Sequence, residues 1–463
     1  MVEGAVELVD GVGAEGVAYL GAVEGDADDA GVCVPVVGDV GEAVEAVDCG
    51  PLGGVEGIAA AHGYSAYRRR WVLVRRDGWC VGQDGRMDSN VTFDPAVVDA
   101  IASIDLDRIG QPGGLDVRVV GVPLAVRFRG VDVREAVLIK GPAGWGEFAP
   151  FKEYEPQEAA AWLAAGIEQS HVGLPAVKRD SVEVNATVPA VAPGQVAEVL
   201  DRFPGCRTVK VKVADRPWEE GSVDDDVARV AAVREYCAAR DVVAQIRVDA
   251  NGAWSVEQAT QAVRRFGPLQ YVEQPCATVD ELAQLRATFP RMGVFVQVAA
   301  DESIRRAEDP FEVARRRACD VAVLKVAPLG GVRRTLAIAD FLAEQGIAVT
   351  IASALDTGVG MYGGLVTAAN LQGFVDDDLM EAPRLAAGLA TGGLFEPGAD
   401  VVPDSLFAVV DGAIAVPRQA PVVDDQRLAA AEARVSDEVR QWWLAHLRAS
   451  LVELRKAVGL ESC

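Results

Sequence analysis

The chain has 463 residues, and 50% of them are hydrophobic, which is enough to bury a large core and suggests two or three domains. Its formal net charge of −25 argues against a nucleic-acid partner or an anionic membrane, because the attraction to phosphate groups would have the wrong sign. The 8 cysteines form no C-x-x-C pair, so we expect reduced thiols without zinc or disulfides. Neither a signal-peptide pattern nor an apolar run of about 18 residues occurs, which predicts a cytoplasmic protein.

The first 60 residues contain no Lys or Arg and consist mainly of Gly, Ala, Val, Asp and Glu. So few large apolar side chains could hardly form a core. We therefore expect residues 1–115 to be a low-complexity acidic extension that does not form a folded domain. Two explanations stay open. The segment is a flexible acidic extension, or it reflects a biased nucleotide composition upstream of the true start of translation, for which Met87 is a candidate.

From residue 116 the pattern changes to strands and one amphipathic helix. Alternating apolar and polar residues predict strands over Asp116–Phe128 and Glu135–Ile139, and a helical period predicts a helix from Pro156 to about Gln169. We expect a small α+β domain over residues 116–180, completed by a C-terminal part over about 400–463.

Residues 181–399 alternate between apolar strand-like runs and helix-patterned segments, for instance the helices Asp225–Ala239 and Val332–Gln345. The runs lack strict alternation, which is typical of parallel strands buried on both faces. The sequence thus predicts an α/β fold with a (β/α) barrel as catalytic domain. The expected strands are Val182–Val188, Thr208–Val213, Gln245–Asp249, Tyr271–Glu273, Val294–Ala300, Val321–Val326, Ala348–Ser353 and Leu379–Ala382.

The C-terminal part is expected to return to the α+β domain. A strand pair lies within Phe407–Val416, and a helix follows from Asp424 to about Lys456. The histidines His62, His171 and His446 lie away from every expected strand end, so we do not expect a histidine base.

Three carboxylates end three consecutive expected strands: Asp249, Glu273 and Asp301. One acid at a strand end is more often a helix cap or a surface residue, but three in succession are hard to explain in that way. The C-terminal strand ends of a parallel barrel meet at one face, where active sites of this fold lie. An all-oxygen ligand set suits Mg²⁺, with Mn²⁺ as a substitute, so the sequence predicts a metal site.

Lysines flank these acids on the neighbouring strands. Lys210 and Lys212 are two residues apart, so both side chains project to one face of their strand, and Lys325 arrives from across the barrel. A base must be neutral near pH 7, and the repulsion between two ammonium groups beside a metal should lower the pKa of Lys212. We expect Lys212 to be the base, and Lys210 its electrostatic partner and a contact to a substrate carboxylate.

The order Lys-x-Lys, Asp-x-Asn, Glu-Gln-Pro, Asp-Glu-Ser and a late Lys resembles the enolase superfamily, muconate-lactonizing branch. Within it, the motif from Gly144 through Glu147 to Phe151 and the segment Asn185-Ala-Thr187 are similar to o-succinylbenzoate synthases of the actinobacterial type. The resemblance covers roughly residues 116–420. It implies a modified TIM barrel whose mouth is covered by an α+β capping domain. We expect a turn at the Gly-Trp-Gly-Glu start of the motif.

The resemblance implies syn dehydration of 2-succinyl-6-hydroxy-2,4-cyclohexadiene-1-carboxylate to o-succinylbenzoate, in menaquinone biosynthesis. Lys212 would act as base and then as acid, with Lys325 stabilising charge on the opposite face of a small carboxylate substrate. Asn251 and Glu302 would orient the ligands and lysines. Ser353 and Asp356, at the seventh strand end, are candidate substrate contacts.

Two alternatives stay open at this point. An N-acylamino acid racemase or another cycloisomerase would use the same acids and lysines. A non-catalytic scaffold with a relict site belongs to a different class, and the intact set of acids and lysines counts against it. The sequence does not predict the oligomeric state.

Overall fold

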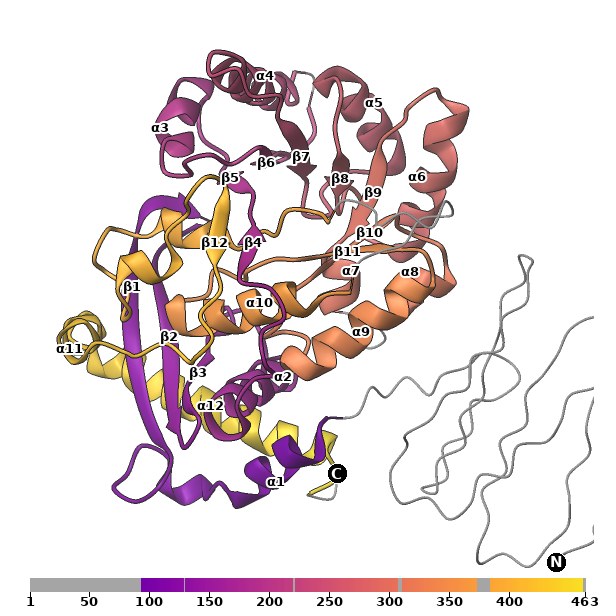
Figure 1. The fold of residues 1–463 in the computed structure, drawn as a ribbon. Helices are drawn as coiled ribbons and strands as arrows, with labels where there is room; N and C mark the ends of the chain where they lie inside the picture. The colour runs from indigo at the N-terminus through magenta and orange to yellow at the C-terminus, as the bar shows by residue number, and fades with distance from the viewer. Residues whose placement is uncertain (1–92, 129, 220, 307–309, 373–383, 461–463) are drawn as a thin grey trace, which may run out of the picture. The chain divides into compact units, whose positions relative to one another are not determined.

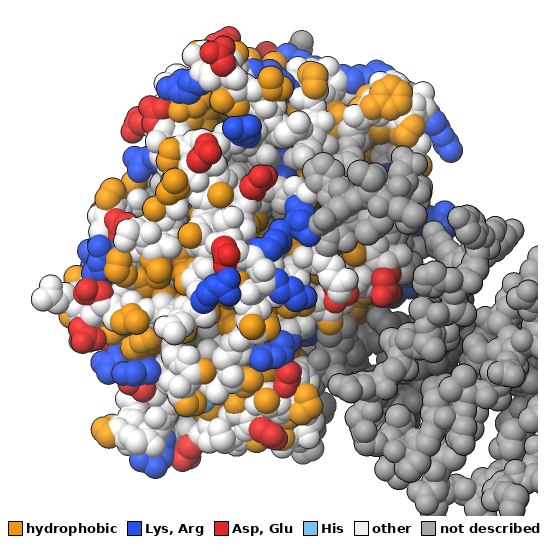
Figure 2. All heavy atoms as spheres, in the orientation of Figure 1, with side chains coloured by type: hydrophobic (Ala, Val, Ile, Leu, Met, Phe, Trp, Pro, Cys, Tyr) orange, Lys and Arg blue, Asp and Glu red, His pale blue; other side chains and the backbone are white. Residues whose placement is uncertain are grey.

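The computed structural model describes residues 93–460 apart from 129, 220, 307–309 and 373–383 (Figure 1). The low-complexity residues 1–92, with Met87, lie outside the described part. On the face drawn in Figure 2, Lys and Arg side chains are interspersed with Asp and Glu and form no large patch of one sign. In the described ranges, no helix is both long and apolar enough to cross a membrane.

The expectation that the chain does not fold before residue 116 is wrong for the segment from residue 93. Helix α1 (Pro95–Ser103) begins with Asp94, whose side chain accepts from the backbone N–H of Ala96 at 2.9 Å. Its Ile101 is fully buried in the main core. The helix packs on elements of the α+β part, which completes that part at its N-terminal end.

An antiparallel sheet in the order β1 (Asp116–Phe128), β2 (Val131–Gly141) and β3 (Gly144–Phe148) forms the capping part. The turn expected at the Gly-Trp-Gly-Glu motif is wrong, because these residues pair with β2 as strand β3. Helices α2 (Pro156–Ile167) and α12 (Asp437–Ala457) pack against each other beside this sheet (Figure 1).

In the described part of the chain, seven parallel strands form the barrel, and Ala387 and Gly388 connect its two edges. The backbone N–H of Asn185 donates to Ala387 at 2.9 Å, and that of Gly388 donates to Ile351 at 2.8 Å. The strand expected at residues 379–382 lies outside the described residues. In sheet order the strands are β5 (Ala186–Val188), β6 (Thr208–Lys212), β7 (Gln245–Asp249), β8 (Tyr271–Glu273), β9 (Gln297–Ala300), β10 (Val321–Leu324) and β11 (Ala348–Ile351).

Helices follow the strands and cover the outside of the barrel (Figure 1). Helix α5 (Val256–Phe266) begins directly after Ser255, which is its N-cap and accepts from the backbone N–H of Gln258 at 3.2 Å. The barrel helices of five or more residues are α3 (Val196–Leu200), α4 (Asp224–Ala238), α5 (Val256–Phe266), α6 (Val279–Arg291), α9 (Val332–Glu344) and α10 (Gly358–Asn370); α7 (Glu302–Arg305) and α8 (Glu312–Arg315) are single turns.

Three expectations about the start of the barrel and the C-terminal part are wrong. The single strand expected over 182–188 is divided, because β4 (Ser181–Glu183) pairs antiparallel with β12 (Ala413–Ala415) before the chain enters the barrel as β5. Part of the strand pair that was expected to return to the capping sheet, strand β12, therefore pairs with β4 instead. The long C-terminal helix is also divided, into α11 (Asp425–Glu432) and α12, because Ser436 caps the start of α12.

Glu147 connects the capping sheet to the barrel. Its carboxylate, on β3, accepts from the backbone N–H groups of Thr357 and Gly360 at 3.1 and 3.2 Å and so caps the N-terminus of α10. Glu147 is 6% exposed, and burial together with the charge of Asp356 raises its pKa to about 8. The docking of the capping sheet on the barrel thus includes a buried acid that titrates in the neutral range.

The raised pKa of Glu147 predicts a pH-dependent contribution to stability. The pKa of this carboxyl group is about 8 in the folded protein and 4.5 in its ordinary state. Its contribution to stability is therefore fully present below pH 4.5 and is lost as the pH rises toward 8. Glu147→Gln does not titrate, so its free energy of unfolding should fall less than that of the wild type between pH 5 and pH 8. Denaturant titrations at both pH values measure this. An unchanged pH dependence, equal to that of the exposed control Glu153→Gln, would contradict the prediction.

Candidate active site

Strand register places the predicted acids side by side. Lys212 pairs with Asp249 across β6 and β7, and Asp249 pairs with Glu273 across β7 and β8. Asp301 follows β9, the next strand of the sheet. The three carboxylates are at most 1% exposed. The structure thus brings Asp249, Glu273 and Asp301 together at the C-terminal strand ends.

Lys210 lies between two of these acids. Its Nζ donates to Glu273 Oε1 at 2.9 Å and to Asp249 Oδ2 at 3.2 Å. Burial alone would lower the pKa of Lys210, but the charges of Glu273 and Asp249 outweigh it, so the pKa is raised. The lowered pKa that the sequence led us to expect concerns Lys212, and it stays a prediction.

Lys212 lies nearer to the opening of the site. Its Nζ donates to Asp249 Oδ2 at 2.5 Å and to Asn251 Oδ1 at 2.7 Å. The amide of Asn251 in turn donates to Glu302 Oε1 at 3.1 Å. Burial would raise the pKa of Asp249, yet Lys212 and Lys210 hold it well below its usual value. Asn251 and Glu302 thus continue a chain of hydrogen bonds from Lys212, and their expected role in orienting the ligands and lysines stays a prediction.

Asp301 is held by two cations. Lys325 donates to Asp301 Oδ2, and Arg305 Nε donates to Asp301 Oδ1 at 3.0 Å. The other guanidinium nitrogens of Arg305 donate to Glu302 Oε1 at 2.6 Å and to the hydroxyl of Tyr154 at 2.5 Å. Burial would raise the pKa of Asp301, but Lys325 and Arg305 lower it. Arg305 thus joins the capping part, through Tyr154, to the acids of the barrel.

Glu273 is the acid whose charge is least compensated. Its Oε2 atom is buried and has no hydrogen-bond partner in the described part of the chain. Burial and the neighbouring Asp249 raise its pKa to about 7. In the same part, no three Asp, Glu, His or Cys side chains converge in a metal-binding arrangement, since Lys or Arg side chains lie against the three carboxylates. The unpartnered oxygen and the all-carboxylate donor set nevertheless fit a hard divalent cation.

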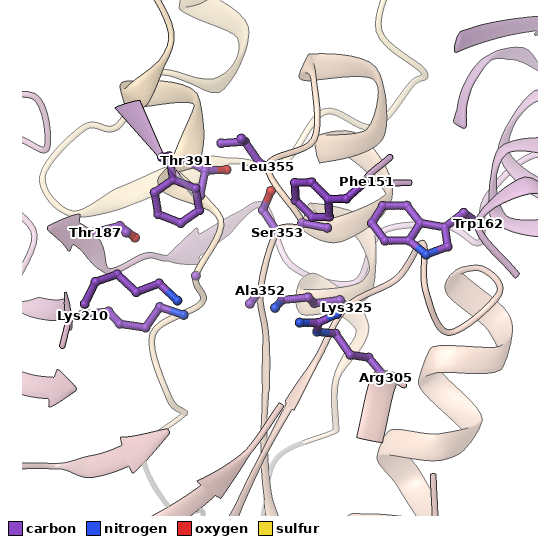
Figure 3. A pocket seen from close by; sticks show the side chains of 14 residues that line it. Phe151, Trp162, Thr187, Lys210, Arg305, Lys325, Ala352, Ser353, Leu355 and Thr391 are labelled. Atoms are coloured by element: carbon purple, nitrogen blue, oxygen red, sulfur yellow. The ribbon is translucent and has the colours of Figure 1, made fainter. Parts of the chain in front are cut away.

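A pocket lies above these acids, between the barrel and the capping part (Figure 3). It is lined by four cations, Lys210, Lys212, Arg305 and Lys325, and by no carboxylate. Its apolar walls include the rings of three aromatic residues. A pocket of this kind suits an anionic ligand that also has an apolar ring. The remaining lining residues are Phe128, Phe151, Trp162, Thr187, Ala352, Ser353, Ala354, Leu355, Gly388 and Thr391.

Of the two weaker candidates, Ser353 lines the pocket and Asp356 does not. Asp356 Oδ2 accepts from the Ser353 hydroxyl at 3.0 Å and from the Ala354 N–H at 3.1 Å. It therefore holds the loop that carries the lining residues. This arrangement does not indicate a direct contact between Asp356 and a ligand.

Sequence reasoning missed Arg305 and the aromatic lining residues. Arg305 stands four residues after Asp301 on a helical turn, a spacing that could have indicated an ion pair. Phe128, Phe151 and Trp162 carry no such signal, because an apolar ring that lines a pocket has the same local pattern as one in a core.

The contacts of Arg305 predict a large effect on stability. Arg305→Met removes a hydrogen-bond donor from Glu302 and from Tyr154. It also removes one of the two cations that pair with Asp301, which is 1% exposed. This loss should lower the free energy of unfolding by about 3–5 kcal/mol. The neighbouring Arg306 pairs with Glu158 nearer the surface at 2.9 Å, so Arg306→Met should cost at most about 1 kcal/mol. Denaturant titration of both variants checks this. Equal losses would contradict the role given to Arg305.

The chain matches two protein families: Enolase C-terminal domain-like over residues 195–421, and Enolase N-terminal domain-like over residues 119–170. Its fold is similar to that of a muconate lactonizing enzyme from Pseudomonas fluorescens, solved with muconolactone, with a TM-score of 0.55 at 22% identity, covering 69% of this chain and 98% of that one. A mandelate racemase/muconate lactonizing enzyme from Roseiflexus sp. gives a TM-score of 0.54 at 20% identity, covering 67% and 98%.

Much closer sequence relatives also exist. The o-succinylbenzoate synthase of Mycobacterium tuberculosis is 50% identical over 336 residues, which are 72% of this chain and 92% of the relative. That of Mycolicibacterium smegmatis is 52% identical over 329 residues, 70% and 92% of the two chains. Because this identity extends over nearly the whole length of these relatives, the chain belongs to the o-succinylbenzoate synthase family of the enolase superfamily.

Proposed function

We propose that the protein dehydrates 2-succinyl-6-hydroxy-2,4-cyclohexadiene-1-carboxylate to o-succinylbenzoate, in the cytoplasm, as a lyase of menaquinone biosynthesis. The observation that carries the proposal is the pocket lined by four cations, three aromatic rings and no carboxylate. The proposed substrate has a ring and two carboxylates. Such a dianion would neutralise the excess positive charge of the lining residues while its ring lies against the apolar walls.

Lys212 is the proposed acid and base. Its Nζ lies at the pocket wall, held by Asp249 and Asn251. As a neutral amine it would take the proton α to the ring carboxylate, and as the resulting ammonium it would give a proton to the departing hydroxyl. A syn elimination needs only one such group, because the proton and the hydroxyl leave from the same face.

Lys325 is the proposed stabiliser of negative charge. Its strand, β10, is separated from β6 in the sheet by β7, β8 and β9, so Lys325 and Lys212 reach the pocket from different strands of the barrel. Figure 3 shows Lys210, which is on the same strand as Lys212, and Lys325 on different sides of the pocket. Lys325 is held by Asp301 and so has a fixed position before the substrate binds. A preorganised ammonium at this place would stabilise the enediolate that forms when the proton leaves.

Asp249, Glu273 and Asp301 are the residues that would hold Mg²⁺ or Mn²⁺. A divalent cation bound there would supply positive charge beside the substrate carboxylate and so make the α proton more acidic. The buried, unpartnered Oε2 of Glu273 supports this role. Lys210, Asn251 and Glu302 would keep the acids and Lys212 in position.

A racemase would need the same residues but a different use of Lys325. Racemisation requires proton transfer on both faces of the substrate, so both lysines must carry protons. A relict scaffold would need none of these transfers. Incubating the protein with the cyclohexadiene substrate and, separately, with N-succinyl amino acids in the presence of Mg²⁺ tests the proposal. Faster racemisation than dehydration would overturn it, as would the absence of both.

Lysine variants separate the two proposed roles. Lys212→Ala should lower kcat for dehydration by about 10²–10⁴-fold, because the acid and base is lost. Lys325→Ala should lower it by about 10²-fold, through the loss of one charge contact. Lys325→Arg keeps the charge but is a very poor proton carrier, so it should restore part of the dehydration.

The exposed Lys178 offers a matched control, since Lys178→Ala should leave kcat unchanged. Steady-state kinetics gives kcat for the four variants and for the wild type. Rapid racemisation of an N-succinyl amino acid by Lys325→Arg would contradict the role given to Lys325. A Lys212→Ala variant that still dehydrates at the wild-type rate would contradict the role given to Lys212.

A further inference from the structure

Two lining residues of the pocket have a buried polar atom without a partner. In the described part of the chain, Trp162 Nε1 and Thr391 Oγ1 make no hydrogen bond, and the two residues are 1% and 5% exposed. A buried polar group that is left unpaired is unfavourable, because it has lost its hydrogen bonds to water. Because both residues line the pocket, a bound ligand is the group that could satisfy them.

The position of Trp162 is fixed by packing. It lies on α2, and its ring contacts Phe151 and Tyr154 with centroid distances of 6.3 and 5.9 Å, both in edge-to-face arrangements. Tyr154 in turn accepts from Arg305, which lines the same wall. Figure 3 shows the indole nitrogen on the edge of the ring that is nearer to Lys325 and Arg305. An indole N–H can only donate, so its partner must carry an acceptor, and the nearby cations Lys325 and Arg305 favour a negatively charged one.

Thr391 belongs to the opposite side of the pocket. It lies in a short 3₁₀ helix, Ala390–Leu394, soon after the segment that connects the two edges of the barrel. In Figure 3 it is on the side of Thr187 and Lys210, and Trp162 is on the other side with Phe151. The two unpartnered donors are thus separated by the width of the pocket.

We propose that Trp162 binds the terminal carboxylate of the substrate's succinyl arm, assisted by the charge of Arg305, and that Thr391 binds the ring carboxylate at the other end. This inference rests on the proposed function. The proposed mechanism uses Lys210, Lys212 and Lys325 around the reacting carboxylate and leaves Arg305 as the lining cation without a part in the chemistry. The second carboxylate of the ligand therefore belongs at the wall that Arg305 shares with Trp162.

Conservative variants test these contacts. Trp162→Phe keeps a ring and removes the N–H, and Thr391→Val keeps the shape and removes the hydroxyl. Trp162→Phe should weaken the binding of o-succinylbenzoate by about tenfold and leave the binding of benzoate, which has no succinyl arm, unchanged. Thr391→Val should weaken both ligands. Calorimetric titration of each ligand into the wild type and both variants, in the presence of Mg²⁺, gives the six affinities.

A second measurement separates a ligand contact from a structural one. Trp162→Phe and Trp443→Phe each replace a buried indole by a smaller ring, but Trp162 Nε1 has no protein hydrogen bond to lose, so Trp162→Phe should lower the free energy of unfolding of the ligand-free protein less. The matched control is Trp443→Phe, because Trp443 Nε1 donates to Glu135 Oε2 at 2.6 Å. That variant should be less stable and should bind o-succinylbenzoate as the wild type does.

The outcomes are distinct. Failure of the wild-type protein to bind o-succinylbenzoate would contradict the proposed function, and this inference with it. Wild-type binding that neither Trp162→Phe nor Thr391→Val weakens would overturn this inference alone. A loss of benzoate affinity in Trp162→Phe equal to its loss for o-succinylbenzoate would show that Trp162 does not bind the arm.

Discussion

The pairing of buried carboxylates with cations at the strand ends is the interaction on which the rest of the site depends. An isolated carboxylate is very costly to bury, and Asp249, Glu273 and Asp301 are buried almost completely. Lys210 compensates the first two, and Lys325 and Arg305 compensate the third. Strand register creates these pairs, since a shift of one residue would turn every such side chain away from the barrel interior.

The same charges connect the two parts of the fold. Arg305 contacts both the acids of the barrel and Tyr154 of the capping part, and Glu147 of the capping sheet caps barrel helix α10. The pocket walls come from both parts as well, with Phe128 and Trp162 from the capping part. Binding of a ligand between them would therefore stabilise the docking of one part on the other.

The sequence was sufficient for features that depend on local pattern. Strand patterns located β7 and β8 at their observed bounds, and the acids expected at the strand ends lie there, buried and side by side. Features that depend on distant contacts were missed. Helix α1 is stabilised by its contacts with the core and by Arg455 of α12, which donates to the backbone carbonyl of Ile104. Strand β4 is defined by its pairing with β12. Whether Trp162 faces a core or a pocket also depends on tertiary packing.

Calorimetric titration of Mg²⁺ tests most directly the claim that the three acids act as one unit. The wild-type protein should bind one divalent cation per chain, and Asp249→Asn, Glu273→Gln and Asp301→Asn should each weaken binding by at least about tenfold, because each removes a charged oxygen donor. The exposed control Glu344→Gln should bind as the wild type does. Wild-type affinity in all three amide variants would contradict the account.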